Sequence, residues 1–332
     1  MPSARRLLLR PEAAAVAGTM LLLVGFNLTS PLFLTAQTFQ SITSMAAELG
    51  IEAIGVTLLM IGGHFDLSIG ATLGASSYLA VWLINDVNVA PFLAFALALL
   101  AGAGFGLVNG LIVTRTHLHS FVVTLGTSLI FRGLLTIWTA GFPIQVTLPD
   151  DMTSALAGQQ LGGFRMSLVW LGGVAILATF ILLRTRLGNW IFAVGQNPQA
   201  ARNLGVPVEA VTVVLFAICG ACGALAGLIQ VARFGSIDAL RGSGTELTCI
   251  AITVIGGTLL TGGYGSAIGT VFGAIIFSMM ELGLVLAGVP GYYFSVFVGL
   301  VLILSVFANS SLQVGVSHIH LGLPGRKGMG LP

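Results

Sequence analysis

Long apolar segments separated by short polar ones dominate this chain of 332 residues. A membrane-spanning helix needs about 20 consecutive apolar residues, and ten segments approach that length. The pattern predicts ten spans near residues 13–34, 39–61, a segment ending at 84, 92–113, 121–140, 166–183, 210–232, 247–260, a segment ending at 286, and 292–308. The eighth is short, which favours a tilted or broken helix, so eight spans with re-entrant segments fit as well.

Composition supports a membrane protein, because 56% of the residues are hydrophobic and only 7% are charged. Soluble domains carry about 25% charged residues. We therefore expect an all-α fold: a polytopic integral membrane helical bundle of about ten spans, with broken or re-entrant segments. Residues 13–308 would form the transmembrane domain, between cytoplasmic tails at 1–12 and 309–332.

The basic residues predict the orientation of this bundle, since they concentrate on the cytoplasmic side of membrane proteins. With ten spans and both termini inside, the cytoplasmic positions are Arg5, Arg6, Arg10, Arg115, Arg184, Arg186, Arg202, Arg326 and Lys327. Arg132 falls within a span, and three arginines fall outside. The first apolar run is too long for a typical cleaved signal peptide, so we expect it to be retained as a span.

A glycine-rich polar stretch, Gly62–Gly74, interrupts two long apolar runs and contains Asp66. A charge at the centre of a bilayer costs about 2.5–3.5 kcal/mol on insertion scales, so this carboxylate must face the bundle interior or a cavity, or the helix must break. Discontinuous helices often line transport pathways. The alternative is a short cytoplasmic turn in which Asp66 caps the next helix.

Glycines recur four residues apart in several predicted helices, which is typical of closely packed helices in lipid. The rows include Gly102, Gly106 and Gly110, and Gly265, Gly269 and Gly273. A second pattern suggests two loosely related halves: residues 267–274 echo residues 68–75, each after a Gly-Gly pair. Related halves are common in transporters.

A polar loop at about 184–209 contains signals for one short helix. Asn197 is a good N-cap, Pro198 suits the first helical position, Arg202 complements the helix dipole, and Gly205 suits the position after the end. A helix of about seven residues is unstable alone in water. We expect it either to dock on a partner protein through Ala200 and Ala201 or to lie on the membrane interface.

Several of these motifs resemble the inner-membrane permeases of ribose-type sugar ATP-binding-cassette importers. The resemblance extends over most of residues 15–308 and rests on the order and spacing of the segments 62–70, 107–113, 121–127, 195–205 and 255–258. The chain departs from the family pattern at four positions, which concern the identity of the solute: His64, Phe65, Ser120 and Glu281.

The resemblance implies a permease subunit in the bacterial inner membrane that translocates a small polar solute, first of all a monosaccharide or related polyol. It implies a periplasmic solute-binding protein, a second permease subunit (identical or paralogous), and a cytoplasmic ATPase with two fused nucleotide-binding halves. The chain itself contains no Gly-x4-Gly-Lys-Ser/Thr phosphate loop, so ATP hydrolysis would belong to the partner. We expect no enzymatic activity, no cofactor and no nucleic acid as a partner.

Three groups of site residues follow. Coupling to the ATPase is assigned to Gln196, Asn197, Ala200, Ala201, Arg202 and Gly205. The solute pathway is assigned to the polar groups at membrane depth, His64, Asp66, Ser68, Thr72, Asn109 and Glu281. Docking of the binding protein is assigned to the three outer arginines, Arg165, Arg233 and Arg241.

Each group has a simpler alternative. Ser68 and Asn109 could instead form hydrogen bonds between helices. Glu281 could pair with Arg132, and the outer arginines could simply be solvated. Cys219 and Cys222 lie among Gly and Ala in an apolar run, which favours helix packing over redox or metal chemistry. The pairs His117/His119 and His318/His320 offer two ligands each, so we predict no metal site.

Other functions remain open. In an ion-coupled secondary transporter, Asp66 or Glu281 would carry a proton. The same importer architecture also serves branched-chain amino acids or nucleosides. An intramembrane enzyme is disfavoured, because we find no Gly-x-Ser-x-Gly or His-Glu-x-x-His motif and no clustered carboxylates at membrane depth.

Overall fold

The structure is a computed structural model that describes residues 11–303. It confirms the all-α expectation. Nine labelled apolar helices are α2 (Pro11–Thr29), α3 (Ala36–Ile61), α4 (Ile69–Asn85), α5 (Pro91–Thr116), α6 (Ser120–Thr139), α8 (Ser167–Arg184), α11 (Val208–Phe234), α12 (Thr245–Ile255) and α13 (Ala267–Leu286). A further apolar helix, Gly291–Ile303, begins with the 3₁₀ turn η1 (Gly291–Tyr293).

The ten predicted spans each correspond to one of these apolar helices. Six helices are long and apolar enough to cross a membrane, and the shorter apolar ones are Gly18–Leu28, Ile69–Asn85, Thr245–Ile255 and Gly291–Ile303. The eighth segment is indeed the short helix α12, of 11 residues. Most of the N-terminal tail, all of the C-terminal tail and the end of the tenth span lie outside the described residues.

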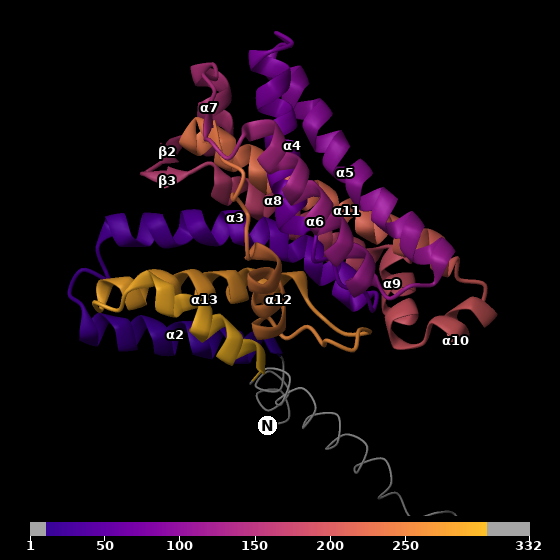
Figure 1. Cartoon of the computed structure of the whole chain (residues 1–332). Coiled ribbons are helices and arrows are strands. Elements are labelled where there is room, and N and C mark those ends of the chain that lie inside the picture. The colour runs from indigo at the N-terminus through magenta and orange to yellow at the C-terminus, as the bar shows by residue number, and fades with distance from the viewer. Residues whose placement is uncertain (1–10, 304–332) are drawn as a thin grey trace, which may run out of the picture.

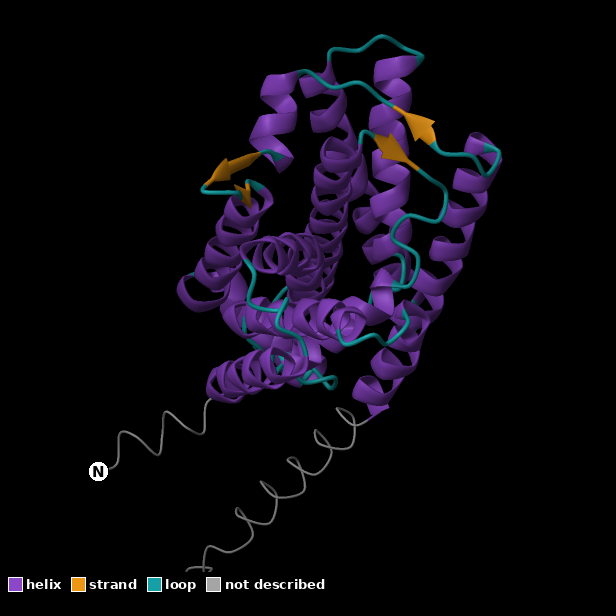
Figure 2. Cartoon of the chain, turned by 90° about the vertical axis from the view of Figure 1, so that its left-hand side faces the viewer, coloured by secondary structure: helices purple, strands orange, loops and turns teal. Residues whose placement is uncertain are grey.

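Small polar elements gather at the two ends of the bundle (Figure 1). One end holds α9 (Arg186–Gln196) and α10 (Pro198–Asn203). The other holds α7 (Asp150–Ala157) and two antiparallel strand pairs. Figure 2 shows both strand pairs in the upper part of the molecule. They are β1 (Ile144–Gln145) with β4 (Ser236–Ile237), and β2 (Gln159–Leu161) with β3 (Phe164–Arg165).

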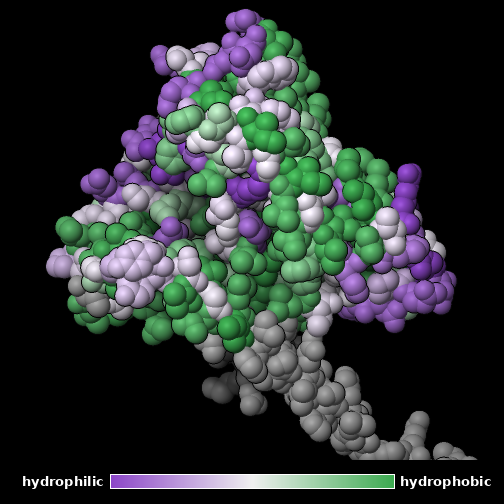
Figure 3. Space-filling model, in the orientation of Figure 1, coloured by the Kyte–Doolittle hydropathy of each residue, from purple (hydrophilic) through white to green (hydrophobic). Residues whose placement is uncertain are grey.

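The surface has the same division (Figure 3). Hydrophilic residues gather over α9 and α10 at one end and over α7 and the strands at the other, with hydrophobic surface between them. Lipid-facing side chains are correspondingly apolar, and they include Leu100, Leu129, Ile176 and Leu183, each at least half exposed. A hydrophobic belt between two polar ends is the surface that a bilayer requires.

Helix α3 forms the centre of the bundle, since 89% of its most apolar 18 residues are buried. It packs against α8, α11, α12 and α13. The contact of α5 with α11 depends on the predicted glycine row. A Cβ atom at Gly106 would overlap the carbonyl oxygen of Phe216, and one at Gly110 would lie 2.8 Å from the Cα atom of Val213. Cys219 and Cys222 also serve packing, because Gly55 of α3 lies directly against both.

The two halves share a turn at the end of a helix, and this turn shows which Gly-Gly pairs correspond to each other. Helix α3 ends in Ile61-Gly62-Gly63, and α12 ends in Ile255-Gly256-Gly257. In each case the second glycine has a positive φ, +85° at Gly63 and +90° at Gly257. In each case the next residue donates its N–H to the carbonyl three residues before the cap, at 3.1 Å. These are Schellman turns. The structural counterpart of Gly62-Gly63 is therefore Gly256-Gly257, not Gly262-Gly263.

We predict that Gly106→Ala lowers the thermal unfolding midpoint of the purified protein, because the new methyl group must push α5 away from α11. Overpacking of this kind costs about 1–3 kcal/mol. Gly104→Ala in the same helix is the matched control, since nothing lies within 4 Å of its new methyl group. An unchanged midpoint for Gly106→Ala would contradict the packing described for α5.

Candidate functional site

The break between α3 and α4 is stabilised by hydroxyl groups of α6. The N–H of Phe65 donates to Ser120 Oγ and the N–H of Leu67 donates to Thr124 Oγ1, both at 3.0 Å. An unpaired backbone N–H within a membrane costs several kcal/mol, so irregular backbone persists there only where other groups pair with it. Ser120, one of the departures from the family pattern, therefore supports the broken segment directly.

Asp66 lies at the centre of a buried network. Its Oδ1 atom accepts from the N–H of Ser68 at 2.7 Å and from the Ser68 hydroxyl at 2.6 Å. The Asn109 side-chain amide of α5 donates to the same hydroxyl at 2.8 Å. Each of these three residues is at most 1% exposed. The network joins α5 to the start of α4.

The hydrogen bonds of Asp66, Ser68 and Asn109 distinguish between the roles that the sequence left open for them. Asp66 bonds the N-cap residue Ser68 and not the N–H groups of the first helical turn, so it does not cap α4 in the usual way. Ser68 and Asn109 do form the interhelical hydrogen bond offered as the simpler alternative. Thr72, also 1% exposed, lies one turn further along α4. A pathway role for these four residues stays a prediction.

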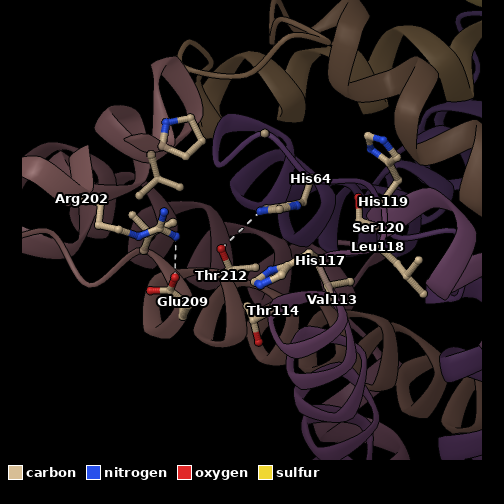
Figure 4. A pocket seen from close by; sticks show the side chains of 14 residues that line it. His64, Val113, Thr114, His117, Leu118, His119, Ser120, Arg202, Glu209 and Thr212 are labelled. Atoms are coloured by element: carbon tan, nitrogen blue, oxygen red, sulfur yellow. Dashed lines mark hydrogen bonds and ion pairs between the residues drawn. The ribbon is translucent and has the colours of Figure 1, made fainter. Parts of the chain in front are cut away.

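His64 lines a pocket of about 320 Å³ at the α9–α10 end of the bundle. Figure 4 shows its ring directed toward Thr212 of α11, and the two side chains are 3.2 Å apart. Polar groups from four segments surround the pocket: Thr114, His117, His119, Arg202 and Glu209. Of the six predicted pathway residues, His64 is thus the one that adjoins the predicted coupling loop.

Glu281 lines a different groove, of about 400 Å³, between α12, α13 and the helix that begins at Gly291. The hydroxyl groups of Ser243, Thr245, Thr248 and Ser295 share this groove with the paired rings of Phe277 and Phe294. Figure 3 shows a hollow with hydrophilic residues in this part of the molecule. Hydroxyl groups, a carboxylate and aromatic rings together can bind a small polar solute.

Glu281 does not meet Arg132, which was the alternative for this pair. The Arg132 guanidinium of α6 donates to the carbonyl oxygens of Arg241 at 3.0 Å and Gly242 at 2.6 Å. It lies 3.9 Å from Glu246 at the start of α12. Arg132 therefore holds the segment that enters α12.

Two buried carboxylates were missed in the sequence, and they correct the expectation that carboxylates do not cluster at membrane depth. Glu48 and Glu52 lie four residues apart in α3 and are 6% and 0% exposed. Glu48 pairs with Arg233 at 2.7 Å. Glu52 accepts from Cys249 Sγ at 3.8 Å, so it lies beside the first turns of α12, where the helix dipole favours negative charge. Their four-residue spacing places both carboxylates on one face of a helix, and this was the sequence feature that could have indicated the pair.

The three outer arginines all interact within the chain. Arg165 donates to the carbonyl oxygen of Ala157 at 2.9 Å, Arg233 pairs with Glu48, and Arg241 lies 3.3 Å from Asp238. Burial lowers the pKa of the Arg165 guanidinium from its ordinary value, and nearby Arg233 acts in the same direction. None of the three is simply a solvated loop residue, and docking of a partner on them stays a prediction.

The predicted loop helix is present as α10, with the expected caps. Asn197 Oδ1 accepts from the N–H of Ala200 at 2.9 Å, and Pro198 is the first helical residue. Gly205 has φ +83°, and the Val206 N–H donates to the Ala201 carbonyl at 3.0 Å, which completes another Schellman turn. Ala201 is buried against the bundle, whereas Ala200 is exposed.

One outward-facing residue of this loop was missed. Leu204 directly follows α10 and is 84% exposed, more than any other large apolar residue of the described chain. The same loop carries the exposed polar residues Gln196, Asn197 and Arg202, and Arg202 pairs with Glu209 at 2.5 Å. Single exposed apolar side chains are common on protein surfaces, so a partner protein for Leu204 stays a prediction. Its signal in the sequence was a leucine next to the C-cap glycine.

Comparison with known proteins agrees with this architecture. Residues 38–306 match the family described as "Branched-chain amino acid transport system / permease component". The chain belongs to this permease family. The ribose import permease protein RbsC of Escherichia coli K12 is 33% identical over 306 residues, which cover 91% of this chain and 94% of the relative. The autoinducer 2 import system permease protein LsrC of Escherichia coli O157:H7 is 34% identical over 91% of this chain and 87% of the relative. No solved structure is significantly similar.

The main expectation from the sequence is thereby confirmed: the chain is a membrane permease subunit of an ATP-binding-cassette importer, not itself a catalytic subunit. The ion-coupled transporter loses support, because the similarity covers almost the whole permease. The breaks after α3 and after α12, and the loop helix α10, all lie within the matched residues.

For the permease we predict that Ser68→Ala lowers thermal stability, because it removes the hydroxyl shared by Asp66 and Asn109. A buried polar group left unpaired costs about 1–3 kcal/mol. Thermal unfolding of Ser68→Ala, Asn109→Ala and the double variant should show a double variant less destabilised than the sum of the two singles. Ser295→Ala, in the open groove, is the control. Fully additive effects would contradict a shared network.

Proposed function

We propose that this permease imports a small polyhydroxylated solute, a monosaccharide or related polyol, with energy from a separate cytoplasmic ATPase. The observation that carries the proposal is the exposed surface of α10 and its flanking residues, a short capped helix with an apolar tip, at one polar end of the bundle. Such a helix needs a partner surface. The ATPase, with two fused halves, is the partner that the family resemblance implies.

Charge supports placing α10 in the cytoplasm. Arg115, Arg184, Arg186 and Arg202 lie at the α9–α10 end, at the ends of α5 and α8 and within α9 and α10. At the opposite end the arginines are accompanied by acidic residues, among them Asp150, Asp151 and Asp238. An excess of basic residues marks the cytoplasmic side. Both termini would then also be cytoplasmic, in the bacterial inner membrane.

The side chains that line the groove at Glu281 and the names of the sequence relatives both support a sugar-like solute. The groove at Glu281 offers four hydroxyl groups, one carboxylate and two aromatic rings, which suit the alternating polar and apolar faces of a sugar. The relatives include permeases named for ribose import and for autoinducer 2 import. The family description names branched-chain amino acids, so leucine is the competing solute to assay.

A second copy or a close paralogue would cover this groove. Its polar lining adjoins apolar side chains, among them the exposed Leu247 and the rings of Phe277 and Phe294. Hydroxyl groups and a carboxylate facing lipid are unfavourable, so a protein partner or a water-filled path between two subunits is the better environment. His64 and Glu281 would contact solute within the subunit, and the buried residues Asp66, Ser68, Thr72 and Asn109 would do so only after the network opens.

At the outer end, the surface around Arg165, Arg233 and Arg241 would receive the solute-binding protein. These guanidinium groups are held in place by Glu48, Asp238 and backbone carbonyl groups. Such preorganised charges can orient an acidic partner with little further ordering.

The coupling role of Arg202 provides the test. Purified permease should retain its ATPase partner, and Arg202→Glu should abolish the stimulation of ATP hydrolysis by solute-loaded binding protein. Glu209→Gln is the matched control, because it breaks the same exposed ion pair without changing Arg202. Exposed pairs contribute about 0.2–1 kcal/mol, so this variant should remain near wild type.

Equal loss in both variants would show that Arg202 acts only through Glu209 and not on the ATPase. Failure of the wild-type permease to retain any ATPase would overturn the proposed function itself. Uptake that stops with an uncoupler while ATP is maintained would restore the ion-coupled alternative.

A further inference from the structure

Three chain segments meet at four glycines beside the coupling helices. We call Gly63, Gly195, Gly262 and Gly263 the glycine junction. Gly63 belongs to the turn that ends α3, Gly195 lies in the last turn of α9, and Gly262 and Gly263 belong to the loop between α12 and α13. The junction thus joins the coupling end of the chain to both broken regions of the permease.

The segments touch through their backbones. The N–H of Gly263 donates to the carbonyl oxygen of Ile61 at 2.8 Å, which ties the loop after α12 to the end of α3. A Cβ atom at Gly195 would overlap that same carbonyl oxygen and lie 2.6 Å from the Gly263 nitrogen. One at Gly262 would lie 2.9 Å from the Cα atom of Gly63. No side chain fits between the three segments.

Backbone conformation imposes a second restriction. Gly63, Gly262 and Gly263 have φ values of +85°, +83° and +74°, a region that residues with a Cβ atom rarely adopt. Gln196, next to Gly195, adds a side-chain hydrogen bond from its Nε2 atom to the Gly263 carbonyl at 3.4 Å. Contacts between backbones have little freedom to adjust, in contrast to contacts between long side chains.

One path from α10 to the rest of the chain leads through this junction. Helix α10 packs mainly on α9, and α9 contacts α3, α8 and α11. At the junction the end of α9 lies against Ile61, three residues before His64 and five before Asp66. It also lies against the loop that leads into α13, the helix that carries Glu281. One displacement of α9 would therefore reach both solute-facing regions.

We infer that the glycine junction transmits the movement of α9 and α10 to both broken helices as one unit. The inference rests on the proposed ATP-driven import and adds the place where the two halves are coupled to the ATPase. Gly63, Gly195, Gly262 and Gly263 are positioning residues. They keep the three segments in direct contact.

The test compares the solute imported per ATP hydrolysed in liposomes that contain the permease with its ATPase and binding protein. For Gly195→Ala we expect continued ATP hydrolysis but a ratio reduced about tenfold, within the usual range of coupling between two sites. Gly172→Ala in α8 is the matched control, because nothing lies within 4 Å of its added methyl group. An unchanged ratio in Gly195→Ala overturns the inference. Wild-type liposomes without ATP-dependent uptake would instead overturn the proposed function.

A second variant covers the case in which Gly195→Ala does not assemble. Gln196→Ala removes the side-chain hydrogen bond to the Gly263 carbonyl and places no new atom between the three segments. We expect it to lower the solute imported per ATP hydrolysed, by less than Gly195→Ala does, because the backbone contacts of the junction remain. An unchanged ratio in Gln196→Ala contradicts the inference.

Discussion

A polypeptide can leave its helical conformation inside a membrane only if other groups pair with the backbone, and this constraint shapes the centre of the permease. Between α3 and α4 the N–H groups of Phe65 and Leu67 donate hydrogen bonds to hydroxyl groups of α6, and the N–H of Ser68 donates to the Asp66 carboxylate. Without these partners the segment would have to continue as a helix or leave the bilayer. The buried carboxylate of Asp66 therefore has a structural role at the break between α3 and α4, independent of any role in a solute pathway.

The chain uses similar devices in its second half. Helix α12 ends in the same Ile-Gly-Gly Schellman turn as α3, its entry is held by Arg132, and the buried Glu52 contacts Cys249 near its start. Glycines at Gly256 and Gly269 then allow α12 and α13 to touch through their backbones. The two broken regions are held by fixed polar contacts and joined where glycines meet, and under the proposed coupling a movement at α9 would not be absorbed locally.

Much of this architecture could be predicted from the sequence. Ten apolar segments gave ten apolar helices, because segment length and hydropathy depend on local sequence alone. The caps of α10 were also predictable, since Asn197, Pro198 and Gly205 each favour one backbone position. Residue spacing likewise indicated that the glycine row of α5 makes a close helix contact, but not that its partner is α11.

The partners of polar residues could not be predicted, because they depend on helices distant in sequence. Arg132 was a candidate partner for Glu281 but holds the entry to α12, 109 residues away. Glu48 and Glu52 were overlooked within an apolar run, and Arg233 proved to be the partner of one of them. The sequence could not show which Gly-Gly pair corresponds to Gly62-Gly63, since two such pairs follow each other closely between 256 and 263. The backbone angles and hydrogen bonds of the turns distinguish them.

ATP-driven import requires α10 to lie on the cytoplasmic side of the membrane. The three native cysteines are buried, so a Leu204→Cys variant would present one reactive thiol in the described part of the chain. A membrane-impermeant maleimide should leave this thiol unlabelled in intact spheroplasts and label it in inverted membrane vesicles. Labelling in intact spheroplasts would place α10 outside, where no ATP-driven partner could reach it, and would contradict the account.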